Sequence, residues 1–236
     1  MKTIELELSV PTALSDITLG QYQRYMKVVE ENEGDDNAGD FLTLKTIEIF
    51  CNISLKEVLS IPAKDADKVL TIINKAFEEK PNLITRFDLL GVDMGFEPKL
   101  ENIALGAYID VEDNISDWQR MHKAMAGLYR PVNFKNKDKY TVAPYEPSEE
   151  VSNLMKEMPL DVVMSAMVFF YDLGKELLRA IPSYIQSNLT EEQTYQLKQT
   201  LAQNGVGTNQ YTDSLEEMFS SLIKLPSFQY SSASTS

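Results

Sequence analysis

Apolar residues recur with two different periods along the chain. In residues 3–10 every second residue is apolar, which is typical of a half-buried strand. The spacing then becomes helical, and Thr18 and Gln21 form a capping box that opens a helix, which we expect to end near Glu31. Three more helices are predicted: one over residues 41–51, a short one from the capping box of Ser54 and Glu57, and one between Pro62 and Pro81.

The middle of the chain predicts a β-hairpin followed by a helix. Residues 83–97 have a strand-like pattern, and Gly91 and Gly95 are expected to supply the positive φ values of its turn. We expect an acidic loop at residues 110–113. Apolar residues then recur at helical spacing over residues 115–129, where they form a single stripe, so an amphipathic helix is predicted there.

The C-terminal part of the chain is predicted to be a linker followed by helices. Residues 132–150 are polar, contain two prolines and are typical of a mobile linker. After a short helix at 151–157, Pro159 suits the start of a long apolar helix at 160–180. The remaining predictions are helices that begin at Thr190 and Asp213 and a serine-rich, disordered tail over residues 227–236.

These patterns together predict an α+β protein that is predominantly helical. A lone strand and a lone hairpin are not stable, so we expect residues 3–10 and hairpin 83–97 to pair in one small sheet. The predicted organisation is an acidic α+β lobe at 1–131, a linker at 132–150, a helical lobe at 151–226 and the tail.

The chain is acidic. Its 236 residues have a net charge of −14, and residues 1–113 hold 22 acidic but 11 basic residues. Nucleic acid and anionic membranes attract clusters of Lys and Arg, so this charge argues against both partners. It is compatible with a basic protein partner, although solubility is the more common reason for such a charge. Because the longest apolar run, residues 162–171, is too short to span a bilayer and the N-terminal residues lack a signal-peptide pattern, we expect a soluble protein.

The residue types that carry chemistry are sparse. The single cysteine, Cys51, lies in an apolar run and is expected to be a buried, inert thiol. The single histidine, His122, follows Trp118 by one helical turn and is predicted to be packed and structural, since one histidine cannot build a multi-histidine metal site. Acidic clusters at 35–36 and 110–113 lack the spacing of a calcium-binding loop.

Motifs for enzymatic chemistry do not occur in the sequence. It has no phosphate-binding loop, no dinucleotide-binding fingerprint and no nucleophile elbow. We therefore expect no catalytic residue, no metal and no cofactor. A small hydrolase that uses paired carboxylates is the enzymatic alternative, because any two acids can meet in a fold. A deep pocket with several convergent acids would favour this alternative.

The apolar helix predicted at 160–180 allows two interpretations. Its apolar residues surround the helix, so it is either central to the core, which is the more common case, or partly covered by a partner. Flexible methionines are well suited to hold apolar segments of a partner. On this partner hypothesis the binding residues are Met155, Met158, Met164, Met167, Phe170 and Trp118.

Several short motifs resemble those of small proteins encoded by tailed bacteriophages. They are F-x-L-x-G-x-x-x-G-F-x-P from Phe87, L-G-x-Y from Leu105, D-W-Q-x-M-H-K-A-M-A from Asp117, L-Y-R-P from Leu128, M-P-L-D-V-V from Met158 and F-F-Y-D-L-G-K-E-L-L from Phe169. The resemblance covers about residues 87–180.

This resemblance implies a non-catalytic tail or baseplate assembly factor, such as a chaperone that holds a tail protein before it is built in. It implies a phage tail or baseplate protein as partner and the host cytoplasm during infection as location. It carries over no catalytic residue. The alternative is a minor structural subunit of the virion, such as an adaptor or baseplate component. The oligomeric state is left open.

Overall fold

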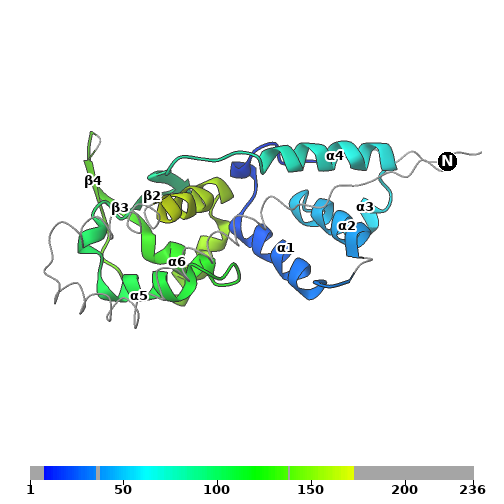
Figure 1. Ribbon diagram of the computed structural model, residues 1–236. Helices are drawn as coiled ribbons and strands as arrows, with labels where there is room; N and C mark the ends of the chain where they lie inside the picture. The colour runs from blue at the N-terminus through cyan, green and yellow to red at the C-terminus, as the bar shows by residue number, and fades with distance from the viewer. Residues whose placement is uncertain (1–7, 36–37, 138, 173–236) are drawn as a thin grey trace, which may run out of the picture.

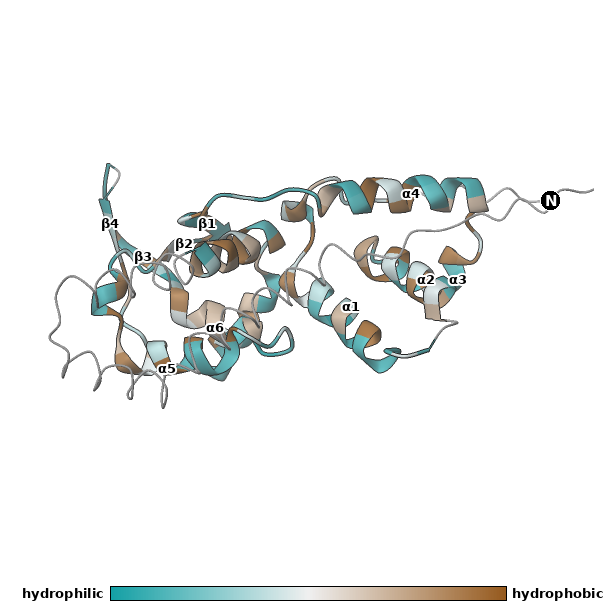
Figure 2. Ribbon diagram, in the orientation of Figure 1, coloured by the Kyte–Doolittle hydropathy of each residue, from teal (hydrophilic) through white to brown (hydrophobic). Residues whose placement is uncertain are grey.

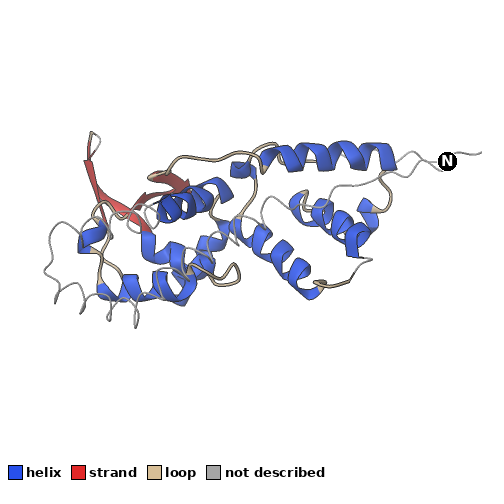
Figure 3. Cartoon of the chain, viewed as in Figure 1, coloured by secondary structure: helices blue, strands red, loops and turns tan. Residues whose placement is uncertain are grey.

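A computed structural model of the chain describes residues 8–35, 38–137 and 139–172 (Figure 1). It has many helices and a small four-stranded antiparallel sheet, so the predicted α+β, predominantly helical class is confirmed. Figure 3 shows the strands gathered at one end of the molecule and a group made of helices at the other.

The helical end is built by local signals in the sequence. Thr18 accepts a hydrogen bond from the backbone of Gln21, and Ser54 does the same for Glu57, so both predicted capping boxes are confirmed. A short 3-10 helix, η1 (Leu14–Asp16), precedes them. The helices of this end are α1 (Leu19–Glu31), α2 (Ala38–Phe50), α3 (Leu55–Val58) and α4 (Ala63–Ala76).

Aromatic rings form the core of this helical end. Tyr25 on α1 lies 5.2 Å from Phe50 on α2, measured between ring centroids, and Phe50 lies 5.6 Å from Phe77 just after α4. The Tyr22 ring packs edge to face against the ring of Trp118, which lies in the segment between α5 and α6, with 4.6 Å between the ring centroids. Such edge-to-face pairs add to the free energy gained by burying the rings. The tryptophan therefore joins the two ends of the molecule.

The sheet differs from the expected one in its strand partners. Its order is β1 (Arg86–Leu89), β2 (Val92–Phe96), β3 (Tyr129–Asn136) and β4 (Lys139–Val142), with each strand antiparallel to the next. The hairpin predicted at 83–97 is present, but it pairs with β3. Residues 8–10 of the predicted N-terminal strand are not in a strand, and residues 1–7 lie outside the described residues.

The pairing of β2 with β3 has a clear physical reason. Tyr129 is fully buried, and its ring lies 5.2 Å from Phe96 and 5.5 Å from Phe87. Its hydroxyl donates a hydrogen bond to the carbonyl of Ile84 at 2.8 Å. Burial of three aromatic rings with a satisfied hydroxyl favours this partner strand over a strand of alternating Glu and apolar residues.

The two glycines of the hairpin have different roles. Leu90 and Gly91 form the turn, with φ values of 53° and 86°, so Gly91 has the predicted left-handed conformation. The prediction for Gly95 was wrong, because it lies inside β2 and its φ is not positive. A Cβ atom there would come within 2.7 Å of the Tyr140 ring. Gly95 thus makes room for a tyrosine whose hydroxyl donates to the Phe96 carbonyl at 2.8 Å.

The segment between the hairpins contains two helices. After a short 3-10 helix, η2 (Leu100–Asn102), come α5 (Leu105–Asn114) and α6 (Met121–Leu128). The acidic residues at 110–113 therefore lie on a helix, and the predicted loop was wrong. The helix predicted over 115–129 is confirmed only for residues 121–128, which form α6. The two helices pack closely because Gly127 has no side chain: a Cβ there would lie 3.0 Å from the Ala107 carbonyl.

The predicted linker contributes to the sheet. Most of β3 and all of β4 lie within residues 132–150, and α7 (Glu149–Leu154) begins before this segment ends. The short 3-10 helix η3 (Met155–Glu157) follows, and a helix then begins at Leu160 and is described as far as residue 172. We call it the Leu160 helix. Its predicted continuation to 180, the helices from Thr190 and Asp213 and the tail 227–236 lie outside the described residues.

The start of the Leu160 helix is joined to the start of α1. The backbone N–H of Leu160 donates to the carbonyl of Ile17 at 2.8 Å, and that of Leu19 donates to Met158 at 2.9 Å. The predicted lobes at 1–131 and 151–226 are thus in direct contact along these residues.

Candidate functional site

The residues predicted to bind a partner lie mostly in the core. Met158 and Met167 have no exposed surface, Met155 has 1% and Met164 and Trp118 have 4% each. Phe170 is half-buried, with its ring 6.2 Å from that of Phe96. The structure therefore brings four methionines into the interior, and the core interpretation of this helix fits their burial. They form no open apolar surface.

The Leu160 helix is buried because it is covered by chain segments that are remote in sequence. Ser165 accepts a hydrogen bond from the backbone N–H of Ile84 at 3.0 Å, just before β1. Phe169 meets the Phe96 ring edge to face at 5.7 Å. Figure 2 shows hydrophobic residues along this helix beside the sheet. A helix that is apolar on all sides is stable only with such cover.

A different helix carries the exposed apolar residues. On α5, Leu105 is 74% exposed, Tyr108 50% and Ile109 45%. With exposed Glu112 they are spaced by three, four and seven residues, so the four side chains share one side of the helix. We call these four residues the α5 outer face. The opposite side of α5 is buried against α6 and includes Ala107, Val111 and Asn114.

All the charged residues of α5 are acidic. The helix contains the acidic residues Asp110, Glu112 and Asp113 and no basic residue. The negative charge of Glu112, and then burial, raise the pKa of Tyr108. An apolar stripe on a helix whose charged residues are all acidic is suited to a surface that is both apolar and basic.

The α5 outer face belongs to a helix that is held on two sides. Besides its contact with α6, α5 lies under Tyr145, whose ring would be 3.0 Å from a Cβ at Gly106. The Tyr145 hydroxyl donates a hydrogen bond to the Asp110 carboxylate. Burial first, and then this carboxylate, raise the pKa of Tyr145 to about 12. The face is therefore presented by a fixed helix, which reduces the entropy lost on binding.

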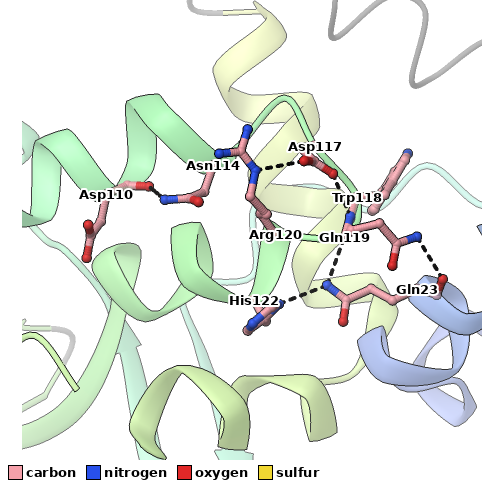
Figure 4. A network of polar contacts seen from close by, with 8 residues as sticks. All are labelled: Gln23, Asp110, Asn114, Asp117, Trp118, Gln119, Arg120 and His122. Carbon is pink, nitrogen blue, oxygen red and sulfur yellow. Dashed lines mark hydrogen bonds and ion pairs between the residues drawn. The ribbon is translucent and has the colours of Figure 1, made fainter. Parts of the chain in front are cut away.

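A network of polar side chains connects α1 to the α5–α6 turn (Figure 4). Buried Gln23 donates to the carbonyl of Trp118 at 2.7 Å and lies 3.1 Å from Nδ1 of His122. Gln119 donates back to the carbonyl of Gln23 at 3.1 Å. Burial, and then the charges of Lys156 and Lys123, lower the pKa of His122 to about 4. The neutral, packed histidine agrees with its predicted structural role.

The described residues contain little reactive chemistry. Cys51 is buried, and this burial raises its pKa to about 11, so its thiol stays protonated as predicted. No group of three or more His, Cys, Asp or Glu side chains in the described part of the chain could hold a metal ion. None of the described helices is long and apolar enough to cross a membrane.

Sequence reasoning missed the α5 outer face, although a signal was present. The apolar spacing of Leu105, Tyr108 and Ile109 is helical, but the following acids were interpreted as a loop. The exposure of the three apolar side chains could not be predicted from this spacing, because a buried apolar stripe has the same period. Comparisons with protein-family models, curated proteins and solved structures find no match to this chain.

Proposed function

We propose that this protein is a non-catalytic assembly factor of the tailed-phage type, which binds a tail or baseplate protein in the host cytoplasm. Two observations support the proposal. The first is the resemblance of residues 87–180 to small tailed-phage proteins. The second, which carries the binding part, is the α5 outer face.

The α5 outer face suggests the chemistry of the client. Large apolar side chains that stay exposed on a fixed helix are typical of a binding surface. The acids on the same helix favour a client segment that carries Lys or Arg beside its apolar residues. We therefore place the contact on Leu105, Tyr108 and Ile109, and no longer on the methionines near the Leu160 helix, because those are buried.

Holding such a segment requires no catalysis. A basic, apolar client segment is prone to aggregate before assembly, and covering it with a soluble acidic protein would prevent this. The net charge of −14 would also keep the complex soluble. On this proposal the protein works through its surface alone.

Co-expression with the tail and baseplate proteins of the phage tests the proposal. We expect one of them to become soluble and to co-purify with the chain. The double substitution Leu105→Ser and Ile109→Ser should abolish co-purification, because it removes the apolar stripe. The matched control is Leu59→Ser with Leu90→Ser, which removes two exposed leucines elsewhere. Equal loss of the client in both double variants would contradict the assignment of α5.

The alternative function is a minor structural subunit of the virion. Mass spectrometry of purified particles beside lysate from infected cells separates the two. An assembly factor is abundant in lysate and absent from particles. A structural subunit stays in particles at a fixed copy number, and this result would exclude the chaperone role while leaving the α5 outer face as an interface.

A further inference from the structure

A second surface, with opposite charge, borders the Gln23 network, because Gln23 and Gln119 are among the residues that line it. A groove of about 680 Å³ runs between α1 and the η3 segment. Gln21, Arg24 and Lys27 line it from α1, and Lys156 lines it from η3. Asn52 and Gln119 are among the other polar residues that line it. Apart from Gly20, all the residues that line it have polar or charged side chains.

Positive charge dominates this groove although the chain as a whole is acidic. Arg24, Lys27 and Lys156 line it together with one acid, Glu157. In the part of the chain that the structure describes, neither Arg24 nor Lys156 forms an ion pair. Lys27 lies 4.0 Å from Glu31, and both side chains are more than half exposed, so solvent weakens this pair.

The fold holds the cations of the groove together. Lys156 lies against α1 because residue 20 is a glycine: a Cβ there would be 3.1 Å from the Lys156 carbonyl and 3.2 Å from its Cβ. The hydrogen bond from Leu19 to Met158 fixes the same junction. Arg24 and Lys27 follow on α1 at a spacing of three residues, which places them on one side of the helix.

We infer that this groove binds an acidic peptide segment of a protein partner, whose carboxylates pair with Arg24, Lys27 and Lys156. Carboxylates are the natural partners of such cations, and the amide side chains that line the groove can bond to a peptide backbone. Small-molecule pockets are mostly apolar, which this groove is not. A nucleic acid requires a longer row of cations than the three that line this groove.

Salt screens the repulsion between an acidic ligand and the acidic residues elsewhere on the chain. At physiological ionic strength charges are screened over about 8 Å, so the surrounding acids act weakly on a ligand that is already seated. The cations of the groove contact the ligand directly and are screened less. We therefore expect selectivity for a short acidic segment that fits the groove, and a measurable decrease of affinity with added salt.

Fluorescence anisotropy with the full chain tests this inference. The probe is a short labelled peptide of alternating glutamate and glycine, with a glutamine–glycine peptide as its neutral counterpart. We expect binding of the acidic peptide alone, and a loss of at least about tenfold in affinity for the double variant Arg24→Gln and Lys156→Gln. The matched control, Lys64→Gln with Lys68→Gln, removes two charges from α4 and should bind as the unchanged chain does.

Three results would overturn the inference. The acidic peptide could fail to bind at low ionic strength. The groove and control variants could lose affinity equally, which would indicate attraction without a site. Inorganic phosphate or a single-stranded oligonucleotide could bind in a groove-dependent way while the peptide does not, which would assign a different ligand. Failure of the α5 client test leaves this experiment unaffected, because Arg24 and Lys156 are not on α5.

Discussion

The Leu160 helix and α5 are both rich in apolar residues, yet they occupy opposite environments. Val163 and Met167 have no exposed surface, whereas Leu105 is 74% exposed. The first helix is apolar all round and is covered by β2 and the segment before β1. The second is apolar on two sides, and α6 covers one of them. The comparison shows that, of these two helices, the more hydrophobic one lies in the core and the half-covered one keeps apolar side chains exposed.

Truncation of a methionine in the Leu160 helix should give the largest effect on stability. Met167→Ala removes a fully buried side chain and leaves a cavity, so we expect the free energy of unfolding to fall by about 2–5 kcal/mol. Leu105→Ala on α5 should change it by about 0.5 kcal/mol or less, because that side chain is exposed. Urea unfolding of the two variants measures the difference. Similar losses in both would break the comparison.

Protonation of His122 should destabilise the buried network as the pH falls. The folded chain holds the pKa of His122 at about 4, below its ordinary value of 6.5. Between these values the unfolded chain binds a proton that the folded chain does not, so stability is complete above 6.5 and decreases toward 4. We expect a loss of up to about 3 kcal/mol, read from urea unfolding across this range.

The control for this titration is His122→Asn, whose side-chain oxygen can accept the bond from Gln23. Carboxylates titrate in part of the same range, so the difference between the two pH profiles isolates the histidine. If the His122→Asn variant loses stability as steeply as the unchanged chain when the pH falls, His122 does not contribute to the pH dependence.

A side chain at Gly127 should separate α5 from α6. Gly127→Val brings its side chain against the backbone of Ala107 and the Val111 side chain, both 3.0 Å from the position of its Cβ. We expect a loss of about 1–3 kcal/mol and weaker client binding, since α5 would be displaced. Gly39→Ala is the control, because nothing lies within 4 Å of its Cβ position. Calorimetric melting and co-purification provide the two readouts.

Removal of the Tyr145 hydroxyl should give the smallest effect. Tyr145→Phe deletes the hydrogen bond to Asp110 but keeps the ring against Gly106. We expect a loss of about 1 kcal/mol at neutral pH. Because the bond links α5 to the segment that carries Tyr145, hydrogen exchange of α5 amides should accelerate while that of the Leu160 helix stays unchanged. Equal acceleration in both helices would mean that they unfold as one unit.

Local signals in the sequence were sufficient for much of the fold. The capping boxes at Thr18 and Ser54, the proline before α4 and the turn at Gly91 each depend on residues within a few positions. The burial of Cys51 and His122 was also predicted correctly from their apolar neighbours in the sequence. These features need no information about distant parts of the chain.

The candidate surfaces were harder to predict. Burial of the methionines depends on Ile84 and Phe96, and exposure of α5 depends on which of its two apolar sides meets α6. The basic groove joins Lys156 to Arg24, which no local pattern relates. A period in the sequence identifies a side of a helix, but it does not say what covers that side.

The sequence by itself determined the helical class, the helix starts at Thr18, Ser54 and Pro62, the hairpin turn and the scarcity of reactive groups, because backbone preferences and residue chemistry are local. The tertiary structure alone decided that β3 is the partner of β2, that residues 132–142 belong largely to the sheet and that α5 is the exposed apolar helix. These outcomes depend on which distant side chains bury each other best, as Tyr129 does between Phe87 and Phe96.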